Sequence, residues 1–303
     1  RLNFEAKVDG DKLTVNVPNR RWDISIPADL VEEVGRIYGY DNLKATQPLL
    51  AETHGGYSAK ETAIRRIKAI VQGQGLMEAI SYSLTSPEKA VRYTKDPKKL
   101  VEVQMPLNSS RSVMRENLMT GLVDAASYNM ARKQKELALF EQGRVYDNEN
   151  DTFNEHEHIA TLYSGSIFNE NWQHLNQDVD FYFVKGQLTN LFRAIGIKDE
   201  DVVYKAEEID GMHLTRTAGI YINKEYVGMI GMIARAVTMA EKSLRGSEIY
   251  GYELDLDKII PMLSKGMTAK PAPKFPAISR DLSILVNKDV DNQEIENVIH
   301  ANA

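Results

Sequence analysis

Two linker-like stretches divide the sequence and limit how it can fold. Residues 51–57 read Ala-Glu-Thr-His-Gly-Gly-Tyr, and residues 264–276 contain three prolines and three lysines. The second composition is typical of an extended linker. The chain has 303 residues, which is more than one average domain. We therefore expect three folding units: residues 1–50, residues 57–262, and the start of another unit at residues 275–303.

The first unit shows a hairpin followed by a short helix. Apolar residues take every second position on both sides of Asp9-Gly10, a pair that favours a tight hairpin turn. A helix is expected to begin near Pro27 and to stop at Gly39, because proline suits the first helical turn and glycine the residue after the last one. The apolar face of this helix comprises Leu30, Val34 and Ile37.

The middle unit mixes strand and helix patterns without a strict strand–helix–strand alternation. Ser58 and Glu61 have the spacing of a capping box, which predicts the start of a helix that glycines end before residue 76. The other expected elements are helices over 118–132 and 181–195, strands over 76–84, 137–141 and 158–163, and a strand pair turning at Asn223-Lys224. Such an order favours an α+β domain with a mostly antiparallel sheet. After the second linker we expect a strand over 281–286 and a helix from Asn292.

The composition excludes several classes of protein. The sequence has no cysteine, which removes disulfides, thiolate metal sites and cysteine nucleophiles and fits a reducing cytoplasm. The net charge of −6 argues against a broad nucleic-acid surface. No apolar run is long enough to cross a membrane. Because the first residue is Arg1 and no signal peptide follows, we expect a soluble piece of a longer chain.

One group of acidic residues is a candidate metal site. Asp29, Glu32 and Glu33 share a helix face, and Asp23 on the preceding extended stretch could close the set. Carboxylate oxygens without histidine or cysteine favour a hard cation such as Mg²⁺. The alternative is that these carboxylates only offset the dipole at the helix N-terminus, and spacing alone leaves both interpretations open.

No other motif predicts chemistry, and we expect no catalytic residue. Glu155-His156-Glu157-His158 lacks the spacing of a helical zinc site and is expected to form a solvated turn that leads into a strand. The run from Gly228 to Gly231 is better explained by close packing within a strand than by phosphate binding.

Several longer stretches resemble the β chains of bacterial phenylalanyl-tRNA synthetases. The first is Val-Pro-Asn-Arg-Arg-Trp-Asp-Ile at residues 17–24, followed by residues 29–41. The others are residues 109–122 around Met-Arg-Glu-Asn-Leu, Phe-Glu-Gln-Gly-Arg-Val-Tyr at 140–146, residues 179–186, Gly-Tyr-Glu-Leu-Asp-Leu at 251–256, and residues 275–283. The resemblance covers essentially the whole sequence.

This resemblance implies a fold for each unit. Residues 1–50 would form a winged-helix-like metal-binding module, and residues 57–262 a class II synthetase-like antiparallel domain. Residues 275–303 would begin a ferredoxin-like anticodon-binding domain. In the family the first module binds Mg²⁺ at a site shared with the α subunit, and Asp23, Asp29, Glu32 and Glu33 match that pattern.

The resemblance also implies a division of labour between subunits. Active class II synthetases carry an arginine at the end of a strand that neutralises the ATP α-phosphate. Here an acidic run, beginning at Asp147, stands in its place, and the glycine-rich third motif is missing. We therefore expect an inactive domain in an α₂β₂ heterotetramer whose α subunit binds ATP and phenylalanine, with tRNA(Phe) as substrate. The helix and strand over residues 59–84 would face that subunit. Alternation predicts that Leu76, Glu78, Ile80 and Tyr82 share one face of this strand.

Two other functions are weighed against this one. The first is a stand-alone nucleic-acid-binding winged-helix module, which Arg20-Arg21 alone would serve poorly in an acidic chain. The second is a carboxylate–metal hydrolase, which would need an activated water and a second group of functional residues. The sequence offers one acidic cluster only.

Overall fold

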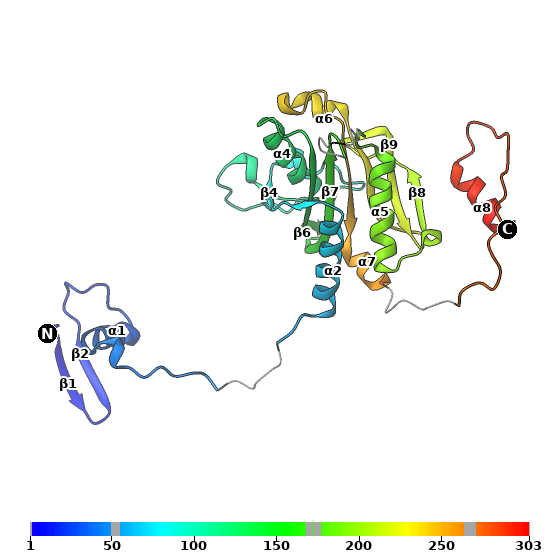
Figure 1. Ribbon diagram of the computed structural model, residues 1–303. Helices are drawn as coiled ribbons and strands as arrows, with labels where there is room; N and C mark the ends of the chain where they lie inside the picture. Colours follow the sequence, from blue (N-terminus) through cyan, green and yellow to red (C-terminus); the bar gives the residue numbers. More distant parts are fainter. Residues whose placement is uncertain (1, 50–54, 168–171, 173–176, 264–270, 303) are drawn as a thin grey trace. The chain divides into compact units, whose positions relative to one another are not determined.

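The computed structural model describes residues 2–49, 55–167, 172, 177–263 and 271–302. The chain separates into two compact units, Arg1–Gly56 and Tyr57–Ala303 (Figure 1). Parts of both predicted linkers, residues 51–54 and 264–270, lie outside the described residues.

The smaller unit contains one hairpin and one helix. Strands β1 (Glu5–Asp9) and β2 (Lys12–Asn16) pair antiparallel, with Gly10 in the left-handed conformation that the tight turn requires. Helix α1 spans Pro27–Tyr38 and is followed by a 3₁₀ turn, Tyr40–Asn42. Both predictions for this unit are thus confirmed. Neither strand nor α1 contains a fully buried residue, and Val34 on the apolar face of α1 stays exposed.

The larger unit is built on a seven-stranded sheet in the order β3-β6-β7-β11-β10-β9-β8. All neighbouring strands pair antiparallel except β3 and β6, so the expected α+β domain with a mostly antiparallel sheet is confirmed. The strands are β3 (Met77–Glu78), β6 (Leu137–Glu149), β7 (Thr152–Ser164), β8 (Val202–Ala206), β9 (Met212–Ile222), β10 (Glu225–Ile233) and β11 (Ile249–Asp255). A separate small pair is formed by β4 (Leu84–Thr85) and β5 (Val113–Met114).

Helices cover both faces of this sheet (Figure 1). Helices α2 (Ala59–Gly73) and α5 (Phe181–Ile195) pack on one face, and α4 (Met119–Met130) packs on the other. Successive strand residues supply the two cores alternately: Phe140 belongs to the first and Leu139 to the second. The shorter helices are α3 (Pro87–Ala90), α6 (Arg235–Ala240) and α7 (Leu256–Ile259), with 3₁₀ turns at Ser109–Arg111, Asp199–Asp201, Lys242–Leu244 and Ile260–Met262.

Several local predictions for this unit are confirmed. Ser58 and Glu61 form the reciprocal capping box at the start of α2, and α5 has the expected bounds. The turn between β9 and β10 places Asn223 and Lys224 at positive φ. Gly228 lies at a register shift in β10, where an added Cβ would come within 2.1 Å of the backbone oxygen of Glu253. Close packing therefore explains the glycines of β10.

Three predictions are wrong. The strand expected over residues 76–84 forms only as β3 and β4, because Ser81 between them bonds to the Glu141 side chain instead of continuing a strand ladder. Residues 281–286 form no strand, since no described segment pairs with them; helix α8 (Asn292–Asn302) follows. The expected turn at residues 155–158 is instead part of β7, which pairs with β6 over its whole length.

None of the helices among the described residues has both the length and the apolarity that a membrane span requires.

Candidate functional site

The four predicted metal ligands, Asp23, Asp29, Glu32 and Glu33, surround the start of α1, and three of them already bond to other groups. Asp29 Oδ2 accepts hydrogen bonds from the backbone N–H groups of Ser25 at 2.7 Å and Ile26 at 2.9 Å. These two bonds, that of Ile26 first, lower the pKa of the Asp29 carboxyl. Asp29, the third residue of α1, therefore reaches back to the N-cap residue Ile26, and its negative charge lies at the helix N-terminus, as the alternative interpretation of the cluster requires.

Arginine side chains form ion pairs with two of the other carboxylates, those of Asp23 and Glu33. Arg21 Nη2 lies 2.7 Å from Asp23 Oδ2 and 3.1 Å from Glu33 Oε1, and Arg36 Nη2 lies 2.7 Å from Glu33 Oε2. Hydrogen bonding to Arg21 lowers the pKa of both Asp23 and Glu33. Glu32 is exposed, and its side chain bonds to no residue that the structure describes.

The donor types suit Mg²⁺, whereas their present arrangement does not. Among the described residues, no three side chains of His, Cys, Asp or Glu are placed together so that they could hold a metal ion. A cation at this position would have to displace Arg21 from Asp23 and Glu33. The chain by itself thus brings the predicted ligands near one helix end without forming a coordination shell.

In the larger unit, stretches that are distant in sequence meet at a buried ion pair. Arg115, which follows β5, places its Nη1 2.6 Å from Oε1 of Glu141 on β6, and both side chains are almost fully buried. Ser81 Oγ donates to the other oxygen of Glu141 at 2.7 Å, and Arg115 Nε donates to the backbone oxygen of Arg144 at 2.9 Å. Gly143 leaves room for this arginine, because a Cβ there would approach Arg115 Nη2 to 2.5 Å.

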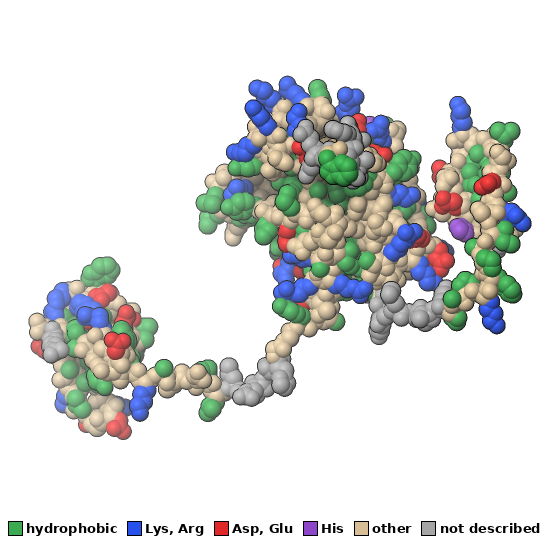
Figure 2. Space-filling view, in the orientation of Figure 1, with side chains coloured by type: hydrophobic (Ala, Val, Ile, Leu, Met, Phe, Trp, Pro, Cys, Tyr) green, Lys and Arg blue, Asp and Glu red, His purple; other side chains and the backbone are tan. Residues whose placement is uncertain are grey.

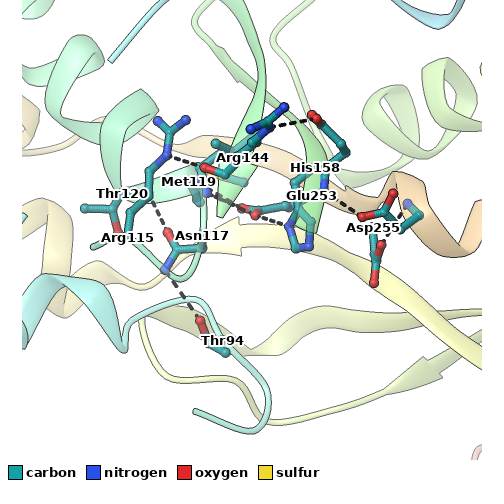
Figure 3. Close-up of polar contacts among 12 residues, drawn as sticks. Thr94, Arg115, Asn117, Met119, Thr120, Arg144, His158, Glu253 and Asp255 are labelled. Atoms are coloured by element: carbon teal, nitrogen blue, oxygen red, sulfur yellow. Dashed lines mark hydrogen bonds and ion pairs between the residues drawn. The ribbon is translucent and has the colours of Figure 1, made fainter. Parts of the chain in front are cut away.

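A second polar group holds the start of α4. Glu253 on β11 accepts hydrogen bonds from the backbone N–H groups of Leu118 and Met119, and its Oε1 lies 2.8 Å from His158 Nδ1 (Figure 3). A carboxylate suits the positive end of a helix dipole. Asn117 beside them accepts from the backbone N–H of Thr120 and donates to the backbone oxygen of Ala90.

Sequence reasoning missed the role of the histidines. His158 is only about one-fifth exposed and pairs with Glu253, while His156 Nε2 lies 2.9 Å from Asp147 Oδ2. The alternating pattern of the strand predicted over residues 158–163 continues toward the N-terminus through His156. This continuation is the sequence feature that could have placed both histidines in a strand.

The β6–β7 hairpin ends in a tight turn. Asn150 and Asp151 are the only residues between the two strands, and both have positive φ. Asp147 near this end accepts a hydrogen bond from Asn154 Nδ2 on the opposite strand at 2.8 Å. Asp147, the acidic residue that stands in place of the expected arginine, therefore lies in a closed hairpin. Among the described residues, no Arg or Lys side chain pairs with it, and its ionisable partner is His156.

The segment between β3 and β4 exposes large apolar side chains. Ile80 is 91% exposed and Tyr82 is 69% exposed, although Leu76 just before them is buried. Met105 and Leu107 in the loop before β5 are also exposed. Figure 2 shows hydrophobic side chains gathered on the side of the larger unit where β4 lies. We call Met77, Ile80 and Tyr82 the exposed apolar segment. An apolar surface of this kind is typical of a protein–protein contact.

Comparison with known proteins gives matches over nearly the whole chain. Residues 43–256 match the family model described as phenylalanyl tRNA synthetase beta chain CLM domain, and residues 1–40 match the tRNA synthetase B5 domain. The chain is 78% identical over 303 residues to the phenylalanine–tRNA ligase beta subunit of Lactobacillus acidophilus. It is 40% identical over 302 residues to that of Latilactobacillus sakei. The match covers 100% and 99% of this chain, respectively.

The chain spans only 38% and 37%, respectively, of the length of these two curated relatives. Among solved structures, a pyrrolysyl tRNA synthetase from Desulfitobacterium hafniense aligns with a TM-score of 0.48 and 13% identity. That alignment covers 66% of this chain and 67% of the other. Each compact unit contains residues that a family model matches, and the beta chain CLM model covers most of the chain. The chain belongs to the phenylalanyl-tRNA synthetase beta chain family.

Proposed function

We propose that this chain forms part of the β subunit of a cytoplasmic phenylalanine–tRNA ligase, which uses ATP to charge tRNA(Phe) with phenylalanine. The observation that carries the proposal is the 78% identity, over the full chain, to the Lactobacillus acidophilus subunit of that name. The stand-alone nucleic-acid-binding module is not favoured, because the family match extends through the larger unit.

Within that enzyme, the larger unit is proposed to be a class II-like domain that does not itself activate phenylalanine. Asp147 would repel a triphosphate, and the two-residue hairpin turn beyond it leaves no loop to fold over a nucleotide. The α subunit would then bind ATP and phenylalanine. The smaller unit is assigned as a winged-helix-like module, and residues 275–303 as the start of a ferredoxin-like domain.

We expect the full-length subunit alone to give no phenylalanine-dependent ATP–pyrophosphate exchange. Adding the α subunit should produce exchange, because only that chain would present a phosphate-binding arginine. The measurement is isotope exchange with each chain alone and with the mixture. Exchange by the β subunit alone, at a rate proportional to its concentration after repeated purification, would contradict the assignment.

A Mg²⁺ site at Asp23, Asp29, Glu32 and Glu33 is proposed to form only in the assembled enzyme. There the ion would supply charge neutralisation between subunits, while Asp29 would continue to cap α1. The support is the oxygen-only donor set, together with the exposed side chain of Glu32, which bonds to no described residue.

Replacing Asp29 with asparagine together with Glu33→Gln is expected to abolish stoichiometric Mg²⁺ binding by the assembled enzyme in calorimetry. Asparagine keeps the helix cap, since its side-chain oxygen also accepts from backbone N–H groups. Asp11→Asn in the hairpin turn of the same unit is the matched control and should leave binding unchanged. Unaltered Mg²⁺ binding by the double variant would remove this site from the proposal.

A further inference from the structure

The larger unit contains a cavity of about 430 Å³ that the proposed function does not use. It lies where β6, β7, β10 and β11 approach the segment Tyr93–Lys98 and the start of α4. Figure 3 shows five of its lining residues, Thr94, Asn117, His158, Glu253 and Asp255. Val145 and Met229 line it with apolar surface. The volume falls within the range of small-molecule pockets.

One buried carboxylate of the lining, that of Glu116, has no hydrogen bond of good geometry. Glu116 is 7% exposed, and both of its carboxylate oxygens are shielded from solvent and accept no well-formed hydrogen bond from a described residue. The neighbouring carboxylates are satisfied: Glu253 by the start of α4, and Asp147 by Asn154 and His156. A buried polar group without a partner is costly, so Glu116 is the point at which a bound donor would be most stabilising.

The charges around the cavity select the kind of ligand. Seven lining carboxyl groups face three lysines. Lys95 pairs with Glu207, Lys98 with Glu149, and Lys258 bonds to the backbone oxygen of Tyr226 and to Asp255. Because every lining lysine already has a partner, a phosphate or carboxylate group would find no free cation there. The cavity therefore favours a cation and disfavours nucleotides and zwitterionic amino acids.

We propose that this cavity binds a small organic amine in its ammonium form, with the buried Glu116 carboxylate turning toward the cavity to accept its hydrogen bonds and the apolar body packing against Val145 and Met229. The ammonium supplies the donor that Glu116 lacks and the charge that the surrounding carboxylates attract. The apolar body replaces water in the remaining volume. This inference does not depend on the catalytic assignment of either subunit.

The pH dependence of binding follows from the environment of Glu116. Burial first, and the charge of Asp147 on β6 to a smaller extent, raise the pKa of Glu116 to about 7, although the backbone N–H and the charge of Lys98 act in the opposite direction. His156, which also lines the cavity, pairs with Asp147, and the positive charge that acts on the Glu116 carboxyl is that of Lys98. Above this pKa the carboxylate is charged and attracts an ammonium ion; below it, the neutral acid does not. Affinity should therefore fall about tenfold between about pH 8 and about pH 6, where alkylamines stay protonated.

The test uses isothermal titration calorimetry on the full-length subunit at about pH 8. The probe is n-pentylamine, and two compounds with a similar alkyl body serve as ligand controls: 1-pentanol, which has no charge, and norleucine, which adds a carboxylate. We expect pentylamine to bind at least about tenfold more tightly than either control compound, because only pentylamine has a positive charge and no negative charge.

The variant Glu116→Gln should weaken pentylamine binding about tenfold or more, since the amide keeps the shape and loses the charge. Glu155→Gln is the matched control: it removes a carboxylate of β7 that lies outside the cavity lining and pairs with Arg144, and it should leave the affinity unchanged. Equal binding of pentylamine and pentanol to the wild-type protein overturns the proposal without any variant. So does the absence of pentylamine binding, or unchanged binding by a folded Glu116→Gln protein.

Discussion

Replacing Arg115 with methionine is expected to lower the free energy of unfolding of the larger unit by about 3–5 kcal/mol. Glu141 is only 2% exposed, and its Oε1 receives the 2.6 Å bond from Arg115. Removing the arginine leaves a buried carboxylate that retains only its bonds from the backbone N–H and hydroxyl of Ser81. The effect is measured as the shift in the urea midpoint of that unit, followed by circular dichroism.

Two further variants separate the ion pair from general damage. The double variant Arg115→Met with Glu141→Leu should lose less stability than Arg115→Met alone, because no unpaired charge stays buried. The matched control is Arg144→Met, whose guanidinium is half exposed and pairs with Glu155 and Glu157; it should leave the midpoint almost unchanged. An equal loss in the single and double variants would show that packing, and not the buried charge, explains the effect.

Ile80→Asp is expected to prevent stable co-purification with the proposed α subunit while leaving the fold of this chain intact. Ile80 adds almost nothing to the core of its own chain, so the fold tolerates an aspartate there. A charge at the centre of an apolar contact loses the burial of the isoleucine and leaves a carboxylate unpaired, which costs an obligate interface about 2 kcal/mol or more. The measurement is co-purification from co-expressed chains, with circular dichroism of the variant alone.

The matched control is Leu214→Asp on β9, another exposed leucine-sized apolar residue, remote from the exposed apolar segment in the strand order. It should not change assembly. If the Ile80 variant folds and still binds the α subunit with wild-type affinity, the partner contact does not include this segment. If both variants weaken assembly equally, the effect is not specific to it.

These two experiments concern one continuous piece of structure. Ser81 lies between Ile80 and Tyr82, and its backbone N–H and hydroxyl both bond to Glu141. The buried ion pair therefore fixes the backbone that presents the exposed apolar side chains. We expect that Arg115→Met also weakens assembly, less than Ile80→Asp does, because it loosens this backbone without adding a charge to the surface.

The elements that the sequence predicted best are those specified by residues close together in the chain. The capping box of α2, the bounds of α5 and the turn at Asn223-Lys224 all depend on neighbours within a few positions. Local hydrogen bonds and the left-handed backbone of a tight turn decide such features, and one sequence contains that information. The mostly antiparallel sheet followed from the order of those elements.

The predictions that failed depended on distant partners. The segment around Ser81 has the pattern of a strand, yet a glutamate sixty positions later takes its backbone N–H. His158 looked like part of a solvated turn, but Glu253 from β11 holds it in the sheet. Residues 281–286 have a strand-like composition and no described neighbour to pair with. A strand forms only when another segment pairs with it, and the residues of the strand do not show which segment that will be.

The candidate sites divide in the same way. The sequence by itself determined the family resemblance, the acidic residues around α1 and the acidic position at Asp147. Only the tertiary structure decided that Arg21 pairs with two of those carboxylates, that Arg115 and Glu141 form a buried pair, and that Glu116 has no hydrogen bond of good geometry beside a cavity. The physical reason is that charge and hydrogen-bonding capacity belong to residue types, whereas burial and pairing arise only when distant segments pack together.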